Sequence, residues 1–307
     1  MGLALTGLHR KRTGRLSPLK GKELTMLNNV VTEDYLKSLK DPIFISTGMQ
    51  FMDEILGGGL VTGSLVMVQA PSGVGKTSFL MNLTMQVMKQ GKRVFYLSAG
   101  EQDFQEVLER FTSLFADQSY MFFKQQPREW RNERIRRFID KYGDLLDIVY
   151  SDDPLRMIDG QTELSVLFTK ANIEDCVLFV YDYIGSTPAP NAEAEYSYLG
   201  TLAGTLKNLA NQNGMIVATA MQTNRALLQE LRGFDPEKTA PFNEAFTSKS
   251  VIVPQKSTLC ITLFRANQLY YLDIFKNRQN GITGRHRVSI NKNTFEMKKV
   301  PLVPRDN

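Results

Sequence analysis

Cysteine and histidine are nearly absent from this sequence. Its 307 residues include two cysteines, Cys176 and Cys260, and two histidines, His9 and His286. Both cysteines lie in apolar runs, "EDCVLFVYD" and "TLCITLF", which predicts reduced core thiols rather than a disulfide. With so few soft ligands, neither a cysteine metal pair nor a zinc site is expected. This cysteine usage is typical of a cytoplasmic protein.

Long hydrophobic runs are also missing. No apolar run approaches the roughly 20 residues of a membrane span, and the start "MGLALTGLHRKRTGR" lacks the apolar core of a secretory signal. With 42% hydrophobic and 22% charged residues, the composition is that of an ordinary globular protein. The length suits one large α/β domain with additions, or two small domains.

Acidic residues are absent from the first 22 positions. Those positions hold six of the 37 basic residues, which leaves 31 basic against 32 acidic residues in the rest. The six are Arg10, Lys11, Arg12, Arg15, Lys20 and Lys22. We expect residues 1–23 to form a flexible basic tail, which either contacts phosphates or an acidic partner or simply stays solvated. A nearly neutral globular part would have to bind nucleic acid through a few local loops.

A helix is predicted after this tail, over residues 24–42. Its apolar residues recur at near-helical spacing, with Thr32 as a capping residue and Pro42 as a stop. A helix of this length is not stable alone, so it needs a surface on its own domain or on a neighbouring subunit.

Strands and helices alternate from residue 65 onward. Strands are predicted at 64–70, 93–99, 145–152, 176–182, 214–220, 257–265 and 269–278, and helices at 76–90, 102–115 and 198–214. Apolar strands separated by helices indicate an α/β fold, with a mostly parallel central sheet and helices on both faces. The last strands are close together in sequence and predict C-terminal antiparallel hairpins.

Residues 125–141 are rich in arginine with interleaved aromatic and aliphatic residues. The favoured interpretation is a helix with one apolar and one solvated face. The alternative is a surface for nucleic acid or a protein partner.

The stretch "QAPSGVGKTSFL" resembles the phosphate-binding pattern G-x-x-x-x-G-K-[ST], but alanine replaces its first glycine. It follows a predicted strand and opens a predicted helix, whose first N–H groups and dipole favour phosphate. Lys76 is expected to reach the β- and γ-phosphates of ATP, and the Thr77 hydroxyl to bind Mg²⁺. The whole predicted loop is Ala70, Pro71, Ser72, Gly73, Val74, Gly75, Lys76, Thr77 and Ser78.

Two carboxylates follow predicted strands and complete such a site. Asp182 ends "VLFVYD" and is expected to hold Mg²⁺. Glu101 follows "VFYLSAG" and is expected to activate the attacking water. Parallel strands end at one edge of a sheet, which would bring both near the phosphate loop.

Taken together, these motifs resemble the C-terminal ATPase domain of the DnaB-type replicative helicases, which has a RecA-like fold. The similarity runs from about residue 45 to 297 and includes five segments in the order of the family. They are "STGMQFMDEILGGGLVTGSLVMVQAPSGVGKTS", "SAGEQDFQEVLERFTS", "VYDYIGS", "MQTNR" and "FKNRQNGITG".

The resemblance implies roles for further residues. Gln222 matches the glutamine that senses the γ-phosphate, and Arg110 matches an arginine of the nucleotide site. Lys276 and Arg278 match the lysine and arginine fingers that enter the site of the neighbouring subunit. It also implies ATP and Mg²⁺ at the interfaces of a hexameric ring, single-stranded DNA in its channel, and an ATPase domain over residues 43–300 before a C-terminal tail at 301–307. The helix at 24–42 would be the linker that docks on the next subunit.

The sequence also departs from the family. No large N-terminal domain precedes residue 24, which resembles the compact ring helicases of phages and plasmids and leaves contact with a primase or a helicase loader open. The channel loop of the family does not match residues 241–257, where Lys249, Ser250 and Lys256 are the candidate DNA contacts. The other channel loop is expected at residues 186–197, which contain no basic residue.

Three functions therefore compete. The favoured one is a ring helicase that moves 5′ to 3′ on single-stranded DNA and unwinds duplex during replication in a bacterial or phage-infected cytoplasm. The second is a RecA-like phage recombination or strand-annealing ATPase that forms filaments. The third is a scaffold or loader subunit that binds ATP but barely hydrolyses it, which the complete set of catalytic residues disfavours.

Overall fold

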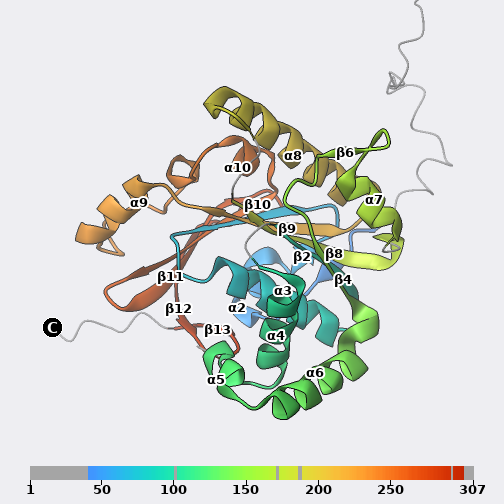
Figure 1. The fold of residues 1–307 in the computed structure, drawn as a ribbon. Helices are drawn as coiled ribbons and strands as arrows, with labels where there is room; N and C mark the ends of the chain where they lie inside the picture. The colour runs from blue at the N-terminus through green and yellow to red at the C-terminus, as the bar shows by residue number, and fades with distance from the viewer. Residues whose placement is uncertain (1–40, 100–101, 171–172, 186–188, 292, 301–307) are drawn as a thin grey trace, which may run out of the picture. The chain divides into compact units, whose positions relative to one another are not determined.

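The computed structural model describes residues 41–99, 102–170, 173–185, 189–291 and 293–300. The basic tail, the helix expected at 24–40, Glu101 and the C-terminal tail lie outside these residues. Contacts divide the chain into Met1–Asp41 and Pro42–Asn307. All the described helices and strands belong to the second unit (Figure 1).

Nine strands form the central sheet, in the order β13-β12-β11-β10-β3-β9-β8-β4-β5. In chain order they are β3 (Leu65–Ala70), β4 (Arg93–Ser98), β5 (Leu146–Tyr150), β8 (Cys176–Ile184), β9 (Ile216–Gln222), β10 (Leu259–Ala266), β11 (Leu269–Asn277), β12 (Gly284–Ile290) and β13 (Met297–Lys299). Neighbours from β5 to β10 pair in parallel, whereas β10 to β13 pair antiparallel. The predicted α/β fold with C-terminal antiparallel hairpins is confirmed.

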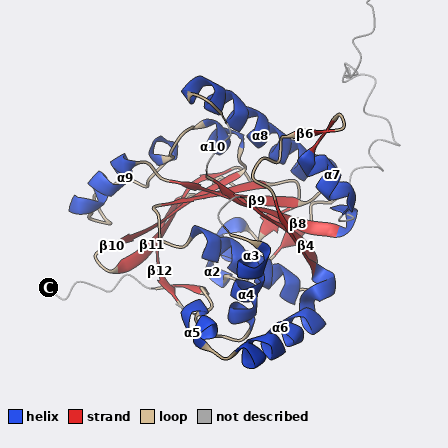
Figure 2. Ribbon diagram, viewed as in Figure 1, coloured by secondary structure: helices blue, strands red, loops and turns tan. Residues whose placement is uncertain are grey.

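Helices cover both faces of this sheet (Figures 1 and 2). One face carries α2 (Gln50–Leu56), α3 (Lys76–Lys89), α4 (Phe104–Phe115), α5 (Tyr120–Gln125) and α6 (Arg128–Tyr142), and the other carries α7 (Glu163–Lys170), α8 (Ala192–Asn213) and α10 (Ile252–Lys256). Successive strand residues point to opposite faces. Val66 and Val68 of β3 therefore join the core on the α3 side, whereas Leu65 and Met67 join the core on the α8 side.

Short elements complete the described fold. Two small sheets pair β1 (Phe44–Ile45) with β2 (Leu60–Val61), and β6 (Met157–Ile158) with β7 (Gln161–Thr162). The remaining pieces are α9 (Arg225–Glu230) and the 3₁₀ turns η2 (Gly143–Leu145), η3 (Ile173–Asp175), η4 (Leu231–Gly233) and η5 (Glu244–Phe246). No helix among the described residues is long and apolar enough to cross a membrane.

A buried ion pair fastens the segment between β9 and β10 to the sheet. Arg285 of β12 donates to both oxygens of the fully buried Asp273 at 2.7 Å, and to the carbonyl of Thr239 at 2.7 Å. Its guanidinium also lies over the rings of Phe234 and Phe242. Burial raises the pKa of Asp273, while Arg285 works in the opposite direction. The pair thus holds this long connection at the antiparallel side of the sheet.

The helix α8 begins earlier than predicted. The side chain of Asn191 accepts the N–H of Ala194, which starts the helix at Ala192. The expectation of a loop over the whole of residues 186–197 was therefore wrong for 192–197, because the capping asparagine was overlooked. The predicted stop is confirmed, since Gly214 adopts a left-handed φ of 59°.

The arginine-rich segment forms α6, as the favoured interpretation predicted. Phe138 and Tyr142 are buried against the core. Its polar side is not simply solvated, however, because Arg131 donates at 2.9 Å to Glu109, whose side chain is only 2% exposed. Lys124 donates to the same carboxylate at 3.0 Å. These ion pairs join α4, α5 and α6.

A candidate nucleotide-binding site

The predicted phosphate loop joins β3 to α3. Gly73 and Gly75 adopt φ values of 74° and 115°, which favour glycine. A Cβ on Gly75 would lie 2.0 Å from Cζ of Phe295, so no side chain fits there. Ala70 is the fully buried last residue of the strand and needs no positive φ. Its methyl group is therefore compatible with the loop.

The loop places Lys76 and Thr77 in the first turn of α3. The Lys76 ammonium lies 5.0 Å from the centre of the Tyr183 ring, and its residue is only 9% exposed. Thr77 Oγ1 donates to Asp182 Oδ1 at 3.2 Å. The two residues predicted to bind Mg²⁺, far apart in sequence, are therefore in direct contact.

Tyr96 of β4 also contacts Asp182, although it was not among the residues predicted from the sequence. The phenol is fully buried and donates a short hydrogen bond to Asp182 Oδ2. Burial, with the Asp182 carboxylate as the second cause, raises the pKa of Tyr96 well above its usual value. The phenol thus stays protonated and remains a donor. A tyrosine inside an apolar parallel strand was the available signal, because its hydroxyl requires a partner.

These side chains fit a small hard cation. The Thr77 hydroxyl and the Asp182 carboxylate offer oxygen atoms, which Mg²⁺ prefers, and leave the other positions to phosphate and water. No group of three or more His, Cys, Asp or Glu side chains suited to holding a metal occurs in the described part of the chain. The donors present thus suit a cation that arrives with its nucleotide.

Gln222, the predicted γ-phosphate sensor, ends β9 beside the loop. It pairs with Ala70 in the sheet register, and the N–H of Thr223 donates to the Ala70 carbonyl at 3.2 Å. The Gln222 carbonyl accepts the N–H of Ser248 at 2.8 Å. Thr223 and Thr247 form a further bridge. Gln222 therefore lies between the phosphate loop and the segment of candidate DNA contacts.

The three candidate DNA contacts lie in different surroundings. Lys249 donates to Glu195 of α8 at 2.8 Å. Ser250 is buried, and its hydroxyl accepts the N–H of Ile252 at 3.0 Å. Lys256, at the end of α10, is exposed and lines an open groove between α8 and α10. Of the three, Ser250 is the least accessible to a ligand.

Arg110, the predicted nucleotide arginine, lies on α4. Its guanidinium donates twice to Glu106, at 2.8 and 2.9 Å, and lies 4.5 Å from the centre of the Tyr120 ring. Its positive charge opposes the rise in the pKa of Tyr96. It therefore acts electrostatically on the Tyr96–Asp182 pair.

Lys276 and Arg278 lie at the opposite edge of the sheet from the phosphate loop. Asn277 pairs with Leu259, and Leu259 pairs with Val66 near the start of β3, whereas the loop follows Ala70 at its end. Four steps of strand separate Val66 from Ala70, about 13 Å at 3.3 Å per residue. The loop and the hairpin add to that distance. Neither side chain is positioned to act on the phosphate loop of its own chain.

Carbonyl groups of α10 hold both of these cations. Lys276 Nζ donates to the carbonyls of Pro254 and Gln255 at 2.6 and 2.8 Å, and Arg278 donates to that of Gln255 at 3.3 Å. Burial lowers the pKa of Lys276. The following turn is tied to the α2–β2 region, where Asn280 donates to the Ile55 carbonyl at 2.7 Å. The fingers therefore extend from a well-anchored hairpin.

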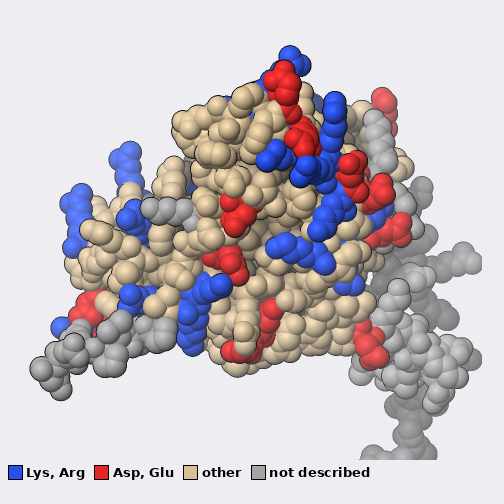
Figure 3. All heavy atoms as spheres, turned by 90° about the horizontal axis from the view of Figure 1, so that it is seen from below, with Lys and Arg blue, Asp and Glu red and all other residues tan. Residues whose placement is uncertain are grey.

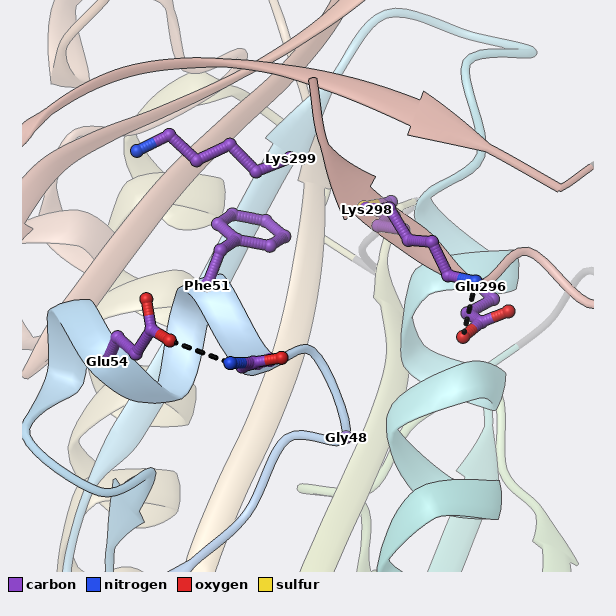
Figure 4. Close-up of a pocket in the computed structure, with 8 residues that line it drawn as sticks. Gly48, Phe51, Glu54, Glu296, Lys298 and Lys299 are labelled. Carbon is purple, nitrogen blue, oxygen red and sulfur yellow. Dashed lines mark hydrogen bonds and ion pairs between the residues drawn. The ribbon is translucent and has the colours of Figure 1, made fainter. Parts of the chain in front are cut away.

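A separate hollow of about 540 Å³ lies between α2 and β13 (Figure 4). Glu54 accepts from Gln50 at 3.0 Å, and Lys298 lies 3.6 Å from Glu296. Its polar side chains thus pair with one another, and no predicted site residue lines it. We assign it no ligand.

Comparison with known proteins points in one direction. The model of the family "DnaB-like helicase C terminal domain" matches residues 44–295. The DNA repair protein RadA of Campylobacter jejuni is 36% identical over 83 residues, which cover 27% of this chain and 17% of that protein. RadA of Mycolicibacterium smegmatis is 33% identical over 97 residues, 32% of this chain and 18% of its own. The matches thus span less than a fifth of these relatives.

Solved structures show the same fold. The ATPase domain of a phage helicase superposes with a TM-score of 0.66 at 14% identity, over 88% of this chain and 95% of that one. A DnaB-like replicative helicase, described with its interactions with primase, gives a TM-score of 0.65 at 14% identity, over 88% of this chain and 66% of the other.

Proposed function

This chain belongs to the DnaB-like helicase C-terminal domain family, ATP-hydrolysing motors with the RecA-like fold, and from that membership we propose a ring helicase that moves on single-stranded DNA. We propose six subunits, 5′-to-3′ movement, and duplex unwinding during replication in a bacterial or phage-infected cytoplasm. Binding of a nucleotide is common to the family; Mg²⁺ as its partner ion is part of the proposal.

One observation carries the proposal. The phosphate loop and the Lys276–Arg278 hairpin lie at opposite edges of one sheet. Subunits arranged head to tail would therefore place the hairpin of one against the loop of the next. Such a heterologous contact closes into a ring when the rotation between neighbours permits it, and otherwise continues as a filament.

The residues divide the work of hydrolysis between two subunits. Backbone N–H groups of the loop and Lys76 hold the phosphates, while Thr77 and Asp182 hold Mg²⁺. When bound, Mg²⁺ neutralises charge on the β- and γ-phosphates. Glu101 accepts a proton from the attacking water. Arg278 and Lys276 of the neighbour place positive charge against the transferring phosphoryl group.

Gln222 is proposed to couple this chemistry to DNA. It adjoins Ala70 on one side and Ser248 on the other through main-chain contacts. A change at the γ-phosphate can therefore shift the segment 247–256 without passing through the rest of the core. That segment and the loop before α8 would face the channel.

Local loops rather than a broad positive face would bind the DNA. Basic and acidic side chains are interspersed on the face seen in Figure 3. We propose Lys249 as a phosphate contact, which must exchange Glu195 for DNA. Backbone N–H groups and Lys256 would add sequence-independent contacts.

Lys249→Ala is expected to weaken binding of single-stranded DNA equally for all sequences. Loss of one phosphate contact should reduce the slope of log affinity against log salt by about one. Fluorescence anisotropy at several salt concentrations measures this slope. Lys298→Ala, which removes a lysine paired with Glu296 on β13, is the matched control. Equal slopes for the two variants would remove Lys249 from the DNA site.

Tyr96→Phe is expected to raise the Mg²⁺ concentration needed for half-maximal ATP hydrolysis by roughly 10-fold or more, because Asp182 loses its donor. Titration of the ATPase rate with Mg²⁺ tests this. Tyr198→Phe is the control, since Tyr198 donates at 2.9 Å to Asp153, away from the site. An unchanged Mg²⁺ midpoint in Tyr96→Phe would show that Asp182 needs no such support.

Imaging by negative stain with ATP and single-stranded DNA tests the function itself. Closed rings that unwind a forked duplex from a 5′ tail are expected. Open filaments that anneal strands without unwinding would instead support a recombination ATPase, the alternative favoured by the RadA matches. A primase or a helicase loader is a further proposed partner, since one similar structure was studied with primase; co-purification tests that contact.

A further inference from the structure

Lys207 of α8 joins two strand ends at the edge of the sheet that carries the fingers. Its ammonium donates to the Gly63 carbonyl at 2.9 Å and to Thr258 Oγ1 at 3.1 Å. Gly63 precedes β3, and Thr258 precedes β10. The half-buried lysine thus fastens the chain ahead of both central strands to the helix that covers them (Figure 1).

Thr258 transmits this contact to Arg278. The N–H of Arg278 donates to the Thr258 carbonyl at 2.8 Å, and the N–H of Thr258 donates to the Leu65 carbonyl at 2.7 Å. The Thr258 hydroxyl, held by Lys207, also accepts the N–H of Leu65 at 3.3 Å. Main chain at the base of the finger is therefore fixed through one residue that Lys207 anchors.

The position has an electrostatic cost. Burial lowers the pKa of Lys207, and the nearby Arg278 guanidinium lowers it further. A cation close to another cation, partly removed from water, needs compensating hydrogen bonds. Gly63 and Thr258 supply them, so the contact is specific to a residue that can donate in both directions.

We propose that Lys207 is a positioning residue for hydrolysis at the subunit interface: it fixes the main chain at Thr258 so that Arg278 meets the phosphates of the neighbouring subunit. The inference rests on the proposed ring with shared sites. Lys207 acts through Arg278 and touches no nucleotide. It was not among the residues singled out from the sequence, because its partners lie 144 and 51 positions away.

Lys207→Met keeps most of the aliphatic side chain but removes the donors. A misplacement of about 1 Å can lower a rate by about 100-fold, so kcat is expected to fall roughly 10- to 100-fold. KM for ATP should stay within about twofold, because the phosphate loop lies at the other edge of the sheet. Lys207→Arg retains the donors and is expected to recover most of the rate. Lys89→Met makes the same substitution in an exposed lysine at the end of α3 and should leave kcat unchanged.

Mixing subunits separates positioning from a general structural role. Lys207→Met subunits keep an intact phosphate loop, and Lys76→Ala subunits keep an intact finger. An equimolar mixture should therefore regain about a quarter of the wild-type rate at its heterotypic interfaces. Thr258→Val removes the same contact from the other partner and serves where Lys207→Met does not fold. It is expected to behave in the same way.

The outcomes are distinct. A rise in KM, or no gain on mixing while Arg278→Ala mixtures do gain, would overturn the role of Lys207 and leave the shared site intact. No gain in Arg278→Ala mixtures either would overturn the shared site and the role of Lys207 with it. Lower kcat, unchanged KM and recovery on mixing together support the inference.

Discussion

Arg278→Ala is expected to lower kcat for ATP hydrolysis by roughly 10³- to 10⁵-fold, the range measured when an arginine finger is withheld. The guanidinium would neutralise charge that develops on the phosphoryl group in the transition state, and alanine cannot. Nucleotide affinity should change little, because the phosphate loop is at the other end of β3. Steady-state ATPase assays with single-stranded DNA, beside direct nucleotide binding, measure the two effects.

Mixing Arg278→Ala with Lys76→Ala subunits tests whether the finger acts across the interface. Each variant alone lacks one half of every site. In an equimolar mixture about a quarter of the interfaces combine an intact loop with an intact finger. Recovery to that fraction is expected. A mixture as inactive as its components would place Arg278 outside the neighbouring site.

Lys76→Ala is expected to raise the Kd for ATP by roughly 30- to 4,000-fold, which corresponds to about 2–5 kcal/mol for a truncated partner of a buried charge pair. Lys76 lies in a largely buried position over the Tyr183 ring, where water can only weakly replace its charge. Titration with a fluorescent ATP analogue measures the Kd.

Glu101→Gln is the informative control for that change. It keeps the loop and should bind the analogue with wild-type affinity while losing turnover, because only proton abstraction from water is removed. If Lys76→Ala bound ATP as tightly as Glu101→Gln, the phosphates would have to be held elsewhere.

Local sequence was sufficient to predict the phosphate loop and much of the fold. A strand, a glycine loop and a helix are contiguous, and their physical requirements lie within about 20 residues. Asp182 could be placed because parallel strands end at a common edge. Its contact with Thr77 bears out that geometric reasoning, although the metal role of the two residues is still a proposal.

Contacts between distant residues could not be predicted in the same way. Tyr96 contacts Asp182 across 86 positions, and Phe295 meets Gly75 from the far end of the chain. Neither has a sequence pattern beyond being an aromatic residue in an apolar context. The early start of α8 was predictable from Asn191, a good capping residue that was read as part of a loop.

The placement of loop and finger at opposite ends of β3 also fixes how sites are counted. A single subunit has both halves but no complete site, and an open row of subunits has one complete site fewer than it has members, with an idle loop at one end and an idle finger at the other. Only closure makes the two numbers equal. ATP turnover per subunit would then report the topology of the assembly, rising with length in open rows and reaching its full value when the last gap shuts.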